Sequence, residues 1–330
     1  MAIILANENA EEKVAMRDAY VDALIELAEH DPLILAVDED LMLAMGIKRF
    51  AEKFPQQTIN CGVQEANMYG VSAGLSLMGF VPYSHTFACF ASRRACDQIF
   101  VSCAYPKLNV RVIGSDPGIT AVINGGTHMP FEDMGIMRTI PGMTILEPTD
   151  SSMIRDMIRQ TADIYGMFYI RLVRRFAVKV YEEGSTFKIG QAIKIREGHD
   201  VTIIASGYCV AEAITAAERL AERGISARVL DMFTIKPVDK ESIISAALET
   251  GAIVTAENHN IINGLGSAVA EVLVEHCPVP MERVGVRDEF GEVGSLSYLA
   301  QRFGLTAAHI IARVESVLER KNKFSHLREA

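Results

Sequence analysis

The sequence contains no tryptophan, no Cys-x-x-Cys pair and no apolar run near the roughly 20 residues that span a bilayer. Its first residues, MAIILANENAEE, lack the basic start and the long apolar core of a signal peptide. These absences predict a cytoplasmic protein that has no membrane segment and no structural zinc site.

Cysteine is scarce, with six residues that form no Cys/His cluster of metal-binding spacing. Cys89, Cys96 and Cys103 lie seven residues apart, so a helix there would place them along one face. We interpret them as buried small hydrophobic side chains in a reduced protein, with a redox or metal role as the alternative. The sequence therefore predicts no metal ligands on this chain.

Positive charge is also in short supply, with 32 Lys and Arg residues against 42 Asp and Glu residues, a net charge of −10. This balance argues against non-specific binding to nucleic acid or to an anionic membrane, because both attract basic proteins. Apolar residues make up 49% and charged residues 22%, which excludes a disordered chain. At roughly 150 residues per domain, the length predicts two domains.

Apolar runs typical of buried strands alternate with helical patterns, which indicates βαβ units around parallel sheets. The expected strands are 33–38, 80–84, 109–114, 143–148, 167–172, 200–206, 227–232, 252–257 and 281–286. The expected helices are 11–29, 64–79, 90–104, 150–164, 209–223, 239–249 and 265–276. The stretch 180–200 is polar and has little strand character, so we expect domains over 1–185 and 186–330.

The segment INCGVQEANMYGVSAGLSLMGF (59–80) places Glu65 at the start of a helix whose following residues are mostly small or apolar. Gly70 and Gly74, four residues apart, would let another helix approach closely. A carboxyl group carried into such a contact is costly unless a partner shares its proton. A glutamate that only stabilises the helix N-terminus is the simpler alternative.

Two further segments carry side chains suited to chemistry. Phe87 and Phe90 are three residues apart, a spacing that fits a stacking platform but also an ordinary core. A long glycine-rich loop contains His128, and loops of that length are usually functional, although many loop histidines are merely solvated. The strand YIRLVRR (169–175) ends in three arginines that could clamp an anion, or could simply be solvated.

Three motifs occur in order: GVQEANMYGVSAGL (62–75), TFACFASRRACDQ (86–98) and GGTHMPFEDMGIMRTIPGM (125–143). Together they resemble the C-terminal half of transketolase, over roughly residues 12–320. The resemblance implies an α/β fold of two doubly wound domains, a thiamine-diphosphate pyrimidine-binding domain followed by a transketolase C-terminal domain. The alternatives are the beta subunit of a 2-oxoacid dehydrogenase first component, which generally lacks the second and third motifs, and a non-catalytic homologue.

The resemblance implies a catalytic role for Glu65, which would hydrogen-bond the aminopyrimidine N1′ of thiamine diphosphate and promote its imino tautomer. The 4′-imino group would then take the C2 proton of the cofactor. Phe90 would stack on the aminopyrimidine ring, with Phe87 supporting it. We expect the apolar surroundings of Glu65 to keep its carboxyl group protonatable.

The same resemblance assigns the substrate residues. Arg17 and Arg174, joined by Arg175, would hold the anionic end of a sugar, and His128 would lie close to the substrate oxygens in a catalytic role. The reaction implied is the transfer of a two-carbon ketol unit from a ketose donor to an aldehyde acceptor.

Three positions depart from the family pattern. Asp116 stands where a phosphate-contacting histidine is usual, Ala44 where a serine is usual, and Asn124 where an aspartate reads a donor hydroxyl. Because an aspartate beside a phosphate dianion is unfavourable, we expect a ketose with another anionic end or another configuration near C2–C4.

The GDG segment with which transketolases bind the metal and diphosphate of the cofactor does not occur. We therefore expect the N-terminal, diphosphate-binding subunit to be a separate chain that holds Mg²⁺ or another divalent ion. Two copies of each chain would form an α2β2 heterotetramer in which this chain dimerises. The Gly264-x-Gly266 segment lacks the third glycine of a dinucleotide fingerprint, so no nucleotide site is expected there.

Overall fold

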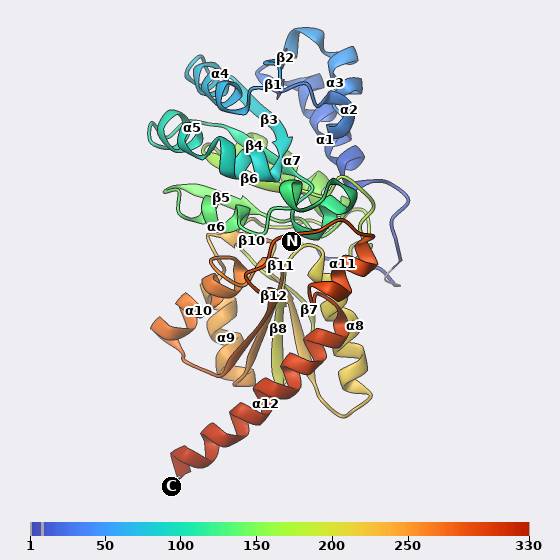
Figure 1. The fold of residues 1–330 in the computed structure, drawn as a ribbon, viewed down its shortest axis with the longest axis vertical. Helices are drawn as coiled ribbons and strands as arrows, with labels where there is room; N and C mark the ends of the chain where they lie inside the picture. Colours follow the sequence, from blue (N-terminus) through green and yellow to red (C-terminus); the bar gives the residue numbers. More distant parts are fainter. Residues whose placement is uncertain (1, 8–9, 330) are drawn as a thin grey trace.

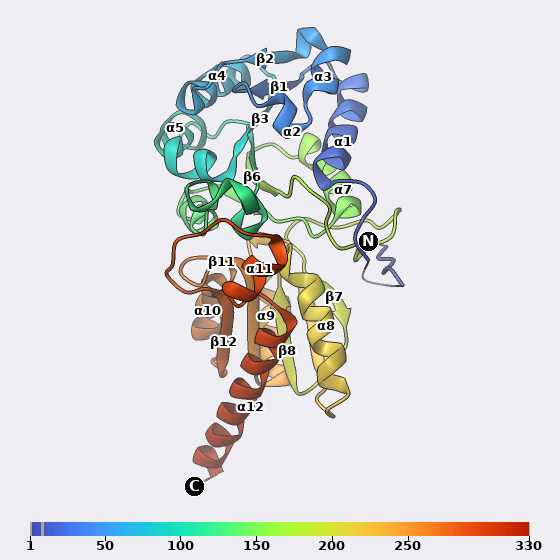
Figure 2. The same cartoon turned by 45° about the vertical axis from the view of Figure 1, so that its right-hand side comes forward.

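The computed structural model describes residues 2–7 and 10–329, with side chains described as far as residue 323. Two α/β units lie end to end, each built on its own sheet (Figure 1). The N-terminal segment runs beside the junction between them, where Leu5 pairs with Tyr181 and Glu11 with Val178. Helix α12 (Ala307–Glu329) packs along the second unit against α8, β11 and β12, and its C-terminal turns project beyond the end of that unit, as Figure 2 also shows.

The first sheet has seven strands in the order β10-β5-β6-β4-β3-β1-β2. All of its pairs are parallel except that of β10 with β5. The strands are β1 (Ile34–Asp38), β2 (Thr58–Asn60), β3 (Val81–Phe87), β4 (Arg111–Ser115), β5 (Met143–Leu146), β6 (Met167–Leu172) and β10 (Thr234–Lys236).

The second sheet has five strands in the order β12-β11-β8-β9-β7, and only the pair of β7 with β9 is antiparallel among its described pairs. Its strands are β7 (Ile193–Arg196), β8 (Val201–Ala205), β9 (Ala227–Asp231), β11 (Ile253–Asn260) and β12 (Met281–Val286). Strand β8 is buried at every position, as expected for a strand covered by helices on both faces.

Helices cover both sheets. They are α1 (Met16–His30), α2 (Met42–Met45), α3 (Lys48–Lys53), α4 (Glu65–Leu77), α5 (Cys96–Gln98), α6 (Asp133–Arg138), α7 (Ser151–Asp163), α8 (Cys209–Ala221), α9 (Lys240–Thr250), α10 (Leu265–His276), α11 (Leu296–Arg302) and α12. Several of them begin at an N-capping side chain. Asp150, Asp239 and Ser295 accept hydrogen bonds from backbone N–H groups in the first turns of α7, α9 and α11, respectively. Among the described helices, none is long and apolar enough to cross a membrane.

The predicted α/β fold of two doubly wound units is confirmed, and every expected strand and helix up to residue 286 has a counterpart. Strand β7 lies inside the stretch 180–200, where we expected little strand structure. The boundary proposed at residues 185 and 186 falls between β6 and β7. Strand β10 lies after this boundary in the sequence, but it pairs with β5 and forms an edge strand of the first sheet.

The expected helix over 90–104 is broken into two π-helical turns, Phe90–Arg94 and Ile99–Ala104, around the short α5. A π-helical turn accommodates one extra residue and is often found at functional sites. Cys89 and Cys103 are buried, and burial raises the pKa of each thiol to about 12. These two cysteines therefore behave as the small hydrophobic side chains that we expected.

One of the three arginines that end β6 has a structural role. Arg171 is buried and forms a bidentate ion pair with Asp133, at 2.8 and 3.0 Å, together with an ion pair to Glu147. Its guanidinium also donates to the backbone oxygen of Asn258 in the second unit. The prediction that all three arginines bind an anion is thus wrong for Arg171. Its buried guanidinium forms contacts between the two units and is not available to a ligand.

Candidate active site

The candidate residues gather at the carboxyl edge of the first sheet. Phe87 ends β3, Asp116 directly follows β4, and Arg174 lies two residues beyond β6. The acidic pair Asp38 and Glu39 ends β1 in the same way. Since the carboxyl ends of parallel strands meet at one edge, residues far apart in the sequence come together there.

Glu65 is the first residue of α4 and is only 4% exposed. Its Oε1 accepts a hydrogen bond from Nη1 of Arg94, whose guanidinium lies 4.2 Å from the centroid of the Phe90 ring. The prediction that Glu65 has purely apolar surroundings is therefore wrong, because a charged side chain contacts its carboxyl group. Because the segment Phe90–Arg94 is a π-helical turn, the Arg94 side chain lies over the Phe90 ring. Its guanidinium therefore covers both the Glu65 carboxyl group and that ring.

Glu39 is a site residue that the sequence analysis did not identify. Its Oε1 accepts a hydrogen bond from Thr86, while its Oε2 is buried without a hydrogen-bond partner. Burial, with a smaller contribution from the nearby charge of Glu65, raises the pKa of Glu39 to about 8. The sequence feature that could have identified Glu39 is the acidic run Asp38–Asp40 at the end of a buried strand.

Phe87, Phe90 and His128 form a cluster of three rings. The ring centroids are 6.0 Å apart for the two phenylalanines, and His128 lies 5.8 Å from Phe87 and 5.1 Å from Phe90, all in edge-to-face geometry. His128 ends the 3₁₀ turn Gly126–His128, and Thr127 is hydrogen-bonded to its Nδ1 at 2.9 Å. The structure thus brings the predicted ring-stacking residues and the predicted histidine together.

Arg174 and Asp116 form a second predicted group. Nε of Arg174 lies 3.1 Å from Oδ2 of Asp116, and the guanidinium lies 5.6 Å from the centroid of Phe87. Burial raises the pKa of Asp116 to about 6, although the charges of Arg174 and Arg175 oppose the shift. Its Oδ1 is buried without a hydrogen-bond partner.

The remaining predicted residues lie in other segments of the first unit. Nη1 of Arg17 donates to the backbone oxygen of Ala44 at 2.8 Å, so these two are neighbours. Asn124 is half-buried at the end of the 3₁₀ segment Gly118–Asn124. Arg175 is exposed and lines a separate cavity of about 420 Å³ at the junction of the two units, so it does not join the Arg174 pair directly.

Comparison with known families favours transketolase over the beta subunit of a 2-oxoacid dehydrogenase. The family described as transketolase, pyrimidine binding domain matches residues 12–177, and the family described as transketolase, C-terminal domain matches residues 190–310. The chain belongs to the transketolase family. The predicted resemblance and both of its domain types are confirmed.

Relatives that are subunits of transketolases match this chain over nearly their whole length. The 6-deoxy-6-sulfo-D-fructose transketolase subunit SqwH of Clostridium sp. (strain MSTE9) is 55% identical over 93% of this chain and 95% of its own. A subunit of the apulose-4-phosphate transketolase of Phocaeicola vulgatus is 38% identical over 90% and 95%. This chain therefore corresponds to a subunit of a split transketolase.

A solved structure gives the same result. The structure described as "Split gene transketolase, inactive beta4 tetramer" is 42% identical, with a TM-score of 0.87 over 94% of this chain and 100% of that one. Transketolase from Campylobacter jejuni, at 19% identity and a TM-score of 0.76, shares the fold. That chain is about twice as long, since the match covers 48% of it.

Thiamine diphosphate is the cofactor that the transketolase family implies, and the site fits its aminopyrimidine part. The buried carboxyl group of Glu65 and the face of Phe90 are joined by the Arg94 side chain, which contacts both, and because Arg94 is 53% exposed it has room to move aside for a bound ring. The unpaired Oε2 of Glu39 is a buried polar atom that a bound ring could satisfy. Among the side chains that the structure describes, up to residue 323, no group of three or more His, Cys, Asp or Glu residues is placed to hold a metal ion.

Proposed function

We propose that this chain binds the pyrimidine end of thiamine diphosphate and the ketose donor, and that a separate subunit binds the diphosphate and its divalent ion. Thiamine diphosphate supplies the nucleophilic carbon and the electron sink for two-carbon transfer. Glu65 holds the aminopyrimidine ring by a hydrogen bond, Phe90 stacks on it, and Phe87 supports Phe90. His128 donates to or accepts from the substrate oxygens near the bond that breaks.

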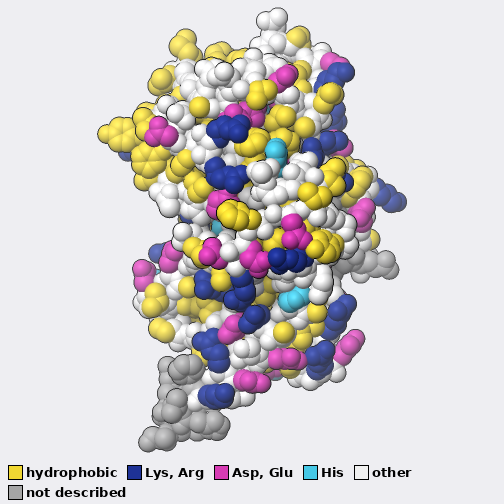
Figure 3. Space-filling view, in the orientation of Figure 1, with side chains coloured by type: hydrophobic (Ala, Val, Ile, Leu, Met, Phe, Trp, Pro, Cys, Tyr) yellow, Lys and Arg dark blue, Asp and Glu magenta, His cyan; other side chains and the backbone are white. Residues whose placement is uncertain are grey.

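An exposed surface of mostly small and apolar residues beside this site supports the need for a partner. Residues of α4 and its preceding turn that recur at helical spacing are exposed, and we call them the α4 stripe: Val63, Asn67, Gly70, Gly74 and Leu77. A Cβ atom built on either glycine meets nothing within 4 Å. Phe100 and Val101 lie exposed on the neighbouring π-helical turn and Tyr105 directly after it, and Figure 3 shows hydrophobic side chains gathered at this edge.

The α4 stripe begins beside Glu65, so a subunit that docks on it also reaches the cofactor site. Glycines on a helix surface allow close approach of a second helix. The occupant that we propose is the diphosphate-binding subunit, in an α2β2 assembly in which this chain also self-associates. Its location in the cytoplasm and its role in carbohydrate metabolism are part of the same proposal.

The donor that we propose is a ketose with a sulfonate end, of the type named for the 55% identical relative, 6-deoxy-6-sulfo-D-fructose. The observation that carries this choice is the buried Asp116 beside Arg174. With a pKa of about 6, Asp116 is mostly ionised at neutral pH and neutralises part of the Arg174 charge. A sulfonate carries one negative charge, whereas a phosphate monoester carries between one and two, so the sulfonate meets less repulsion.

The overall reaction breaks the C2–C3 bond of the donor and forms a new carbon–carbon bond to the acceptor aldehyde. A six-carbon sulfoketose that loses two carbons leaves a four-carbon sulfo-aldose. Arg17 and Arg174 would hold the anionic end while the two-carbon unit moves, because charge-assisted hydrogen bonds fix both position and orientation.

The first test compares the chain alone with the assembled complex. We expect the purified chain to show no ketol transfer and no tight, magnesium-dependent binding of thiamine diphosphate by calorimetry. Addition of the diphosphate-binding subunit should restore both, with the sulfoketose as the best donor. Tight binding of the cofactor by the isolated chain would contradict the division of labour between two chains.

The second test changes the donor preference. We expect xylulose 5-phosphate to be a poor donor for the native complex, and Asp116→His combined with Ala44→Ser to raise its kcat/KM. One or two restored hydrogen bonds correspond to about 1–2 kcal/mol, roughly a 5- to 30-fold gain.

Asp116→Asn is the matched control, since asparagine keeps the shape and tolerates the positive φ of +55° but removes the charge. It should relieve the penalty against phosphate without adding a new phosphate contact, so we expect a smaller gain. If the native complex uses xylulose 5-phosphate as efficiently as the sulfoketose, the proposed donor is wrong.

A further inference from the structure

The loop that carries Asn124 and His128 leaves β4 with a strained backbone. Asp116 has φ +55°, and Val122 has φ +43° and ψ −107° inside the 3₁₀ segment. Positive φ is a genuine outlier for a β-branched residue such as valine, and it persists only where the surroundings hold it. The donor loop, which we define as residues 116–128, therefore depends on contacts from outside itself.

A side chain of the second unit supplies such a contact. Asn258, on β11, is 1% exposed, and its Oδ1 accepts the N–H of Ile119 at 2.9 Å. Its Nδ2 donates to the backbone oxygen of Pro117 at 3.0 Å. One amide thus satisfies a donor and an acceptor of the donor loop immediately after Asp116, a pattern that a carboxylate, which only accepts, cannot match.

The fit at this contact is close. Gly118, with φ +55°, lies between the two bonded residues, and a Cβ there would stand 2.1 Å from Oδ1 of Asn258. At the other end of the loop, a Cβ on Gly126 would stand 2.2 Å from the backbone oxygen of Gly291. The second unit therefore touches the backbone of the donor loop at both ends.

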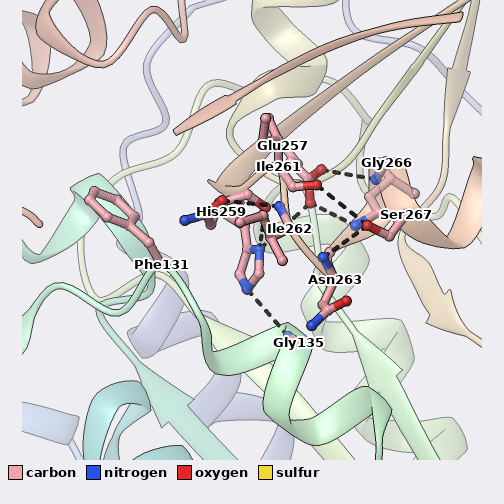
Figure 4. A network of polar contacts seen from close by, with 12 residues as sticks. Phe131, Gly135, Glu257, His259, Ile261, Ile262, Asn263, Gly266 and Ser267 are labelled. Carbon is pink, nitrogen blue, oxygen red and sulfur yellow. Dashed lines mark hydrogen bonds and ion pairs between the residues drawn. The ribbon is translucent and has the colours of Figure 1, made fainter. Parts of the chain in front are cut away.

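Asn258 itself is fixed by its neighbours on β11. Arg171 donates to its backbone oxygen at 3.0 Å. The next residue, His259, is buried, and burial lowers its pKa to about 4, so the ring is neutral. Its Nδ1 lies 2.7 Å from the oxygen of Asn260 and its Nε2 accepts the N–H of Gly135 at 3.3 Å, as Figure 4 shows.

Glu257 also fixes this end of β11. Its carboxylate accepts the N–H groups of Leu265 at 2.6 Å and Gly266 at 2.9 Å, at the start of α10 (Figure 4). The end of β11 is thus bonded to its own unit on one side and to α6 and the donor loop on the other. A side chain carried on such a rigid strand end can set the position of a strained loop.

We propose that Asn258 is a positioning residue for donor binding: it holds the donor loop so that Asp116 and Asn124 face the donor. The second unit thereby takes part in donor selection without touching the substrate. This proposal rests on the proposed function for its kinetic consequence but on geometry alone for the contact itself.

The kinetic test uses the assembled complex with Asn258→Ala and Asn258→Asp. Aspartate keeps the acceptor for Ile119 but replaces the donation to Pro117 by repulsion between two oxygens. We expect kcat/KM for the donor to fall at least 10-fold in both variants, mainly through KM. The KM of the acceptor should stay within twofold. Equal changes in donor and acceptor constants, or none, would overturn the positioning role.

Asn260→Ala is the matched control, because Asn260 lies on the same strand end and its Oδ1 binds only the nearby N–H of Ile262, at 3.0 Å, among the described contacts. It should leave the donor constants unchanged within twofold. A comparable loss of donor kcat/KM in Asn260→Ala would show that any damage to this strand end has the same effect, and would overturn the specific role of Asn258.

A second readout requires no activity. In the 330-residue chain, hydrogen exchange of the backbone amides over 118–128 should be faster in Asn258→Ala than in wild type, and unchanged in Asn260→Ala. Unchanged exchange in Asn258→Ala would overturn the inference whatever the kinetics show. Absence of ketol transfer by the wild-type complex would instead overturn the proposed function, and the exchange data would still decide the contact.

Discussion

Replacement of Glu65 by glutamine is expected to lower kcat of the assembled complex by about 10²- to 10⁴-fold, the range typical of a lost proton-transferring group. Glutamine keeps the size of the side chain and can still hydrogen-bond a ring nitrogen, but it cannot share a proton as a carboxyl group does. Glu65→Ala should be at least as damaging. Because Glu65 is the first residue of α4 and its partner Arg94 is 53% exposed and can be hydrated, the fold should survive both changes.

The measurement is steady-state ketol transfer with saturating cofactor, together with the thermal melting of each variant. Glu29→Gln provides the control, since Glu29 is an exposed glutamate that pairs with Lys53 on the same unit. That substitution should alter neither activity nor melting temperature appreciably. Near-normal turnover in Glu65→Gln would reduce Glu65 to a residue that merely stabilises the start of its helix.

Much of this site could be predicted from sequence because it depends on strand ends and on one short motif. Alternating apolar runs placed β3, β4 and β6, and their carboxyl ends carry Phe87, Asp116 and Arg174. The helix that follows Glu65 was recognisable by its small residues. Periodicity and motif order are local signals, so they can be recognised in the sequence without knowledge of the tertiary packing.

The features that could not be predicted arise from contacts between distant segments. Strand β10 has only three residues and owes its place to pairing with β5 of the other unit. The same local pattern of arginines leaves Arg171 buried in ion pairs and Arg175 exposed. Arg94 covers Glu65 only because of a π-helical turn, for which the sequence offers no periodic signal.

The second unit also shows why its glycine-containing helix start does not indicate a nucleotide site. The N–H groups of Leu265 and Gly266, which a phosphate would need, are already bonded to the carboxylate of Glu257. At the neighbouring end of β8, Oγ of Ser206 donates to Glu147 of the first unit at 2.5 Å. Protein carboxylates thus occupy the positions where α/β sheets commonly bind anions.

Gly74→Trp is expected to abolish assembly with the diphosphate-binding subunit while leaving the chain itself folded. Gly74 lies on the exposed α4 stripe with nothing within 4 Å of a Cβ, so the isolated chain has room for the indole. In a close helix–helix contact there would be no such room. Overpacking by even a few methylene groups costs about 1–3 kcal/mol, and an indole is far larger.

The measurement is co-purification or analytical ultracentrifugation of the two subunits, followed by ketol transfer at equal subunit concentrations, where we expect a loss of about 100-fold or more. Gly74→Ala is the matched control, since one methyl group should be tolerated in all but the tightest contact, and alanine also favours the helix by about 1 kcal/mol. A Gly74→Trp chain that melts like wild type and still assembles would show that the partner docks elsewhere. The α4 stripe would then need another occupant, such as a second copy of this chain.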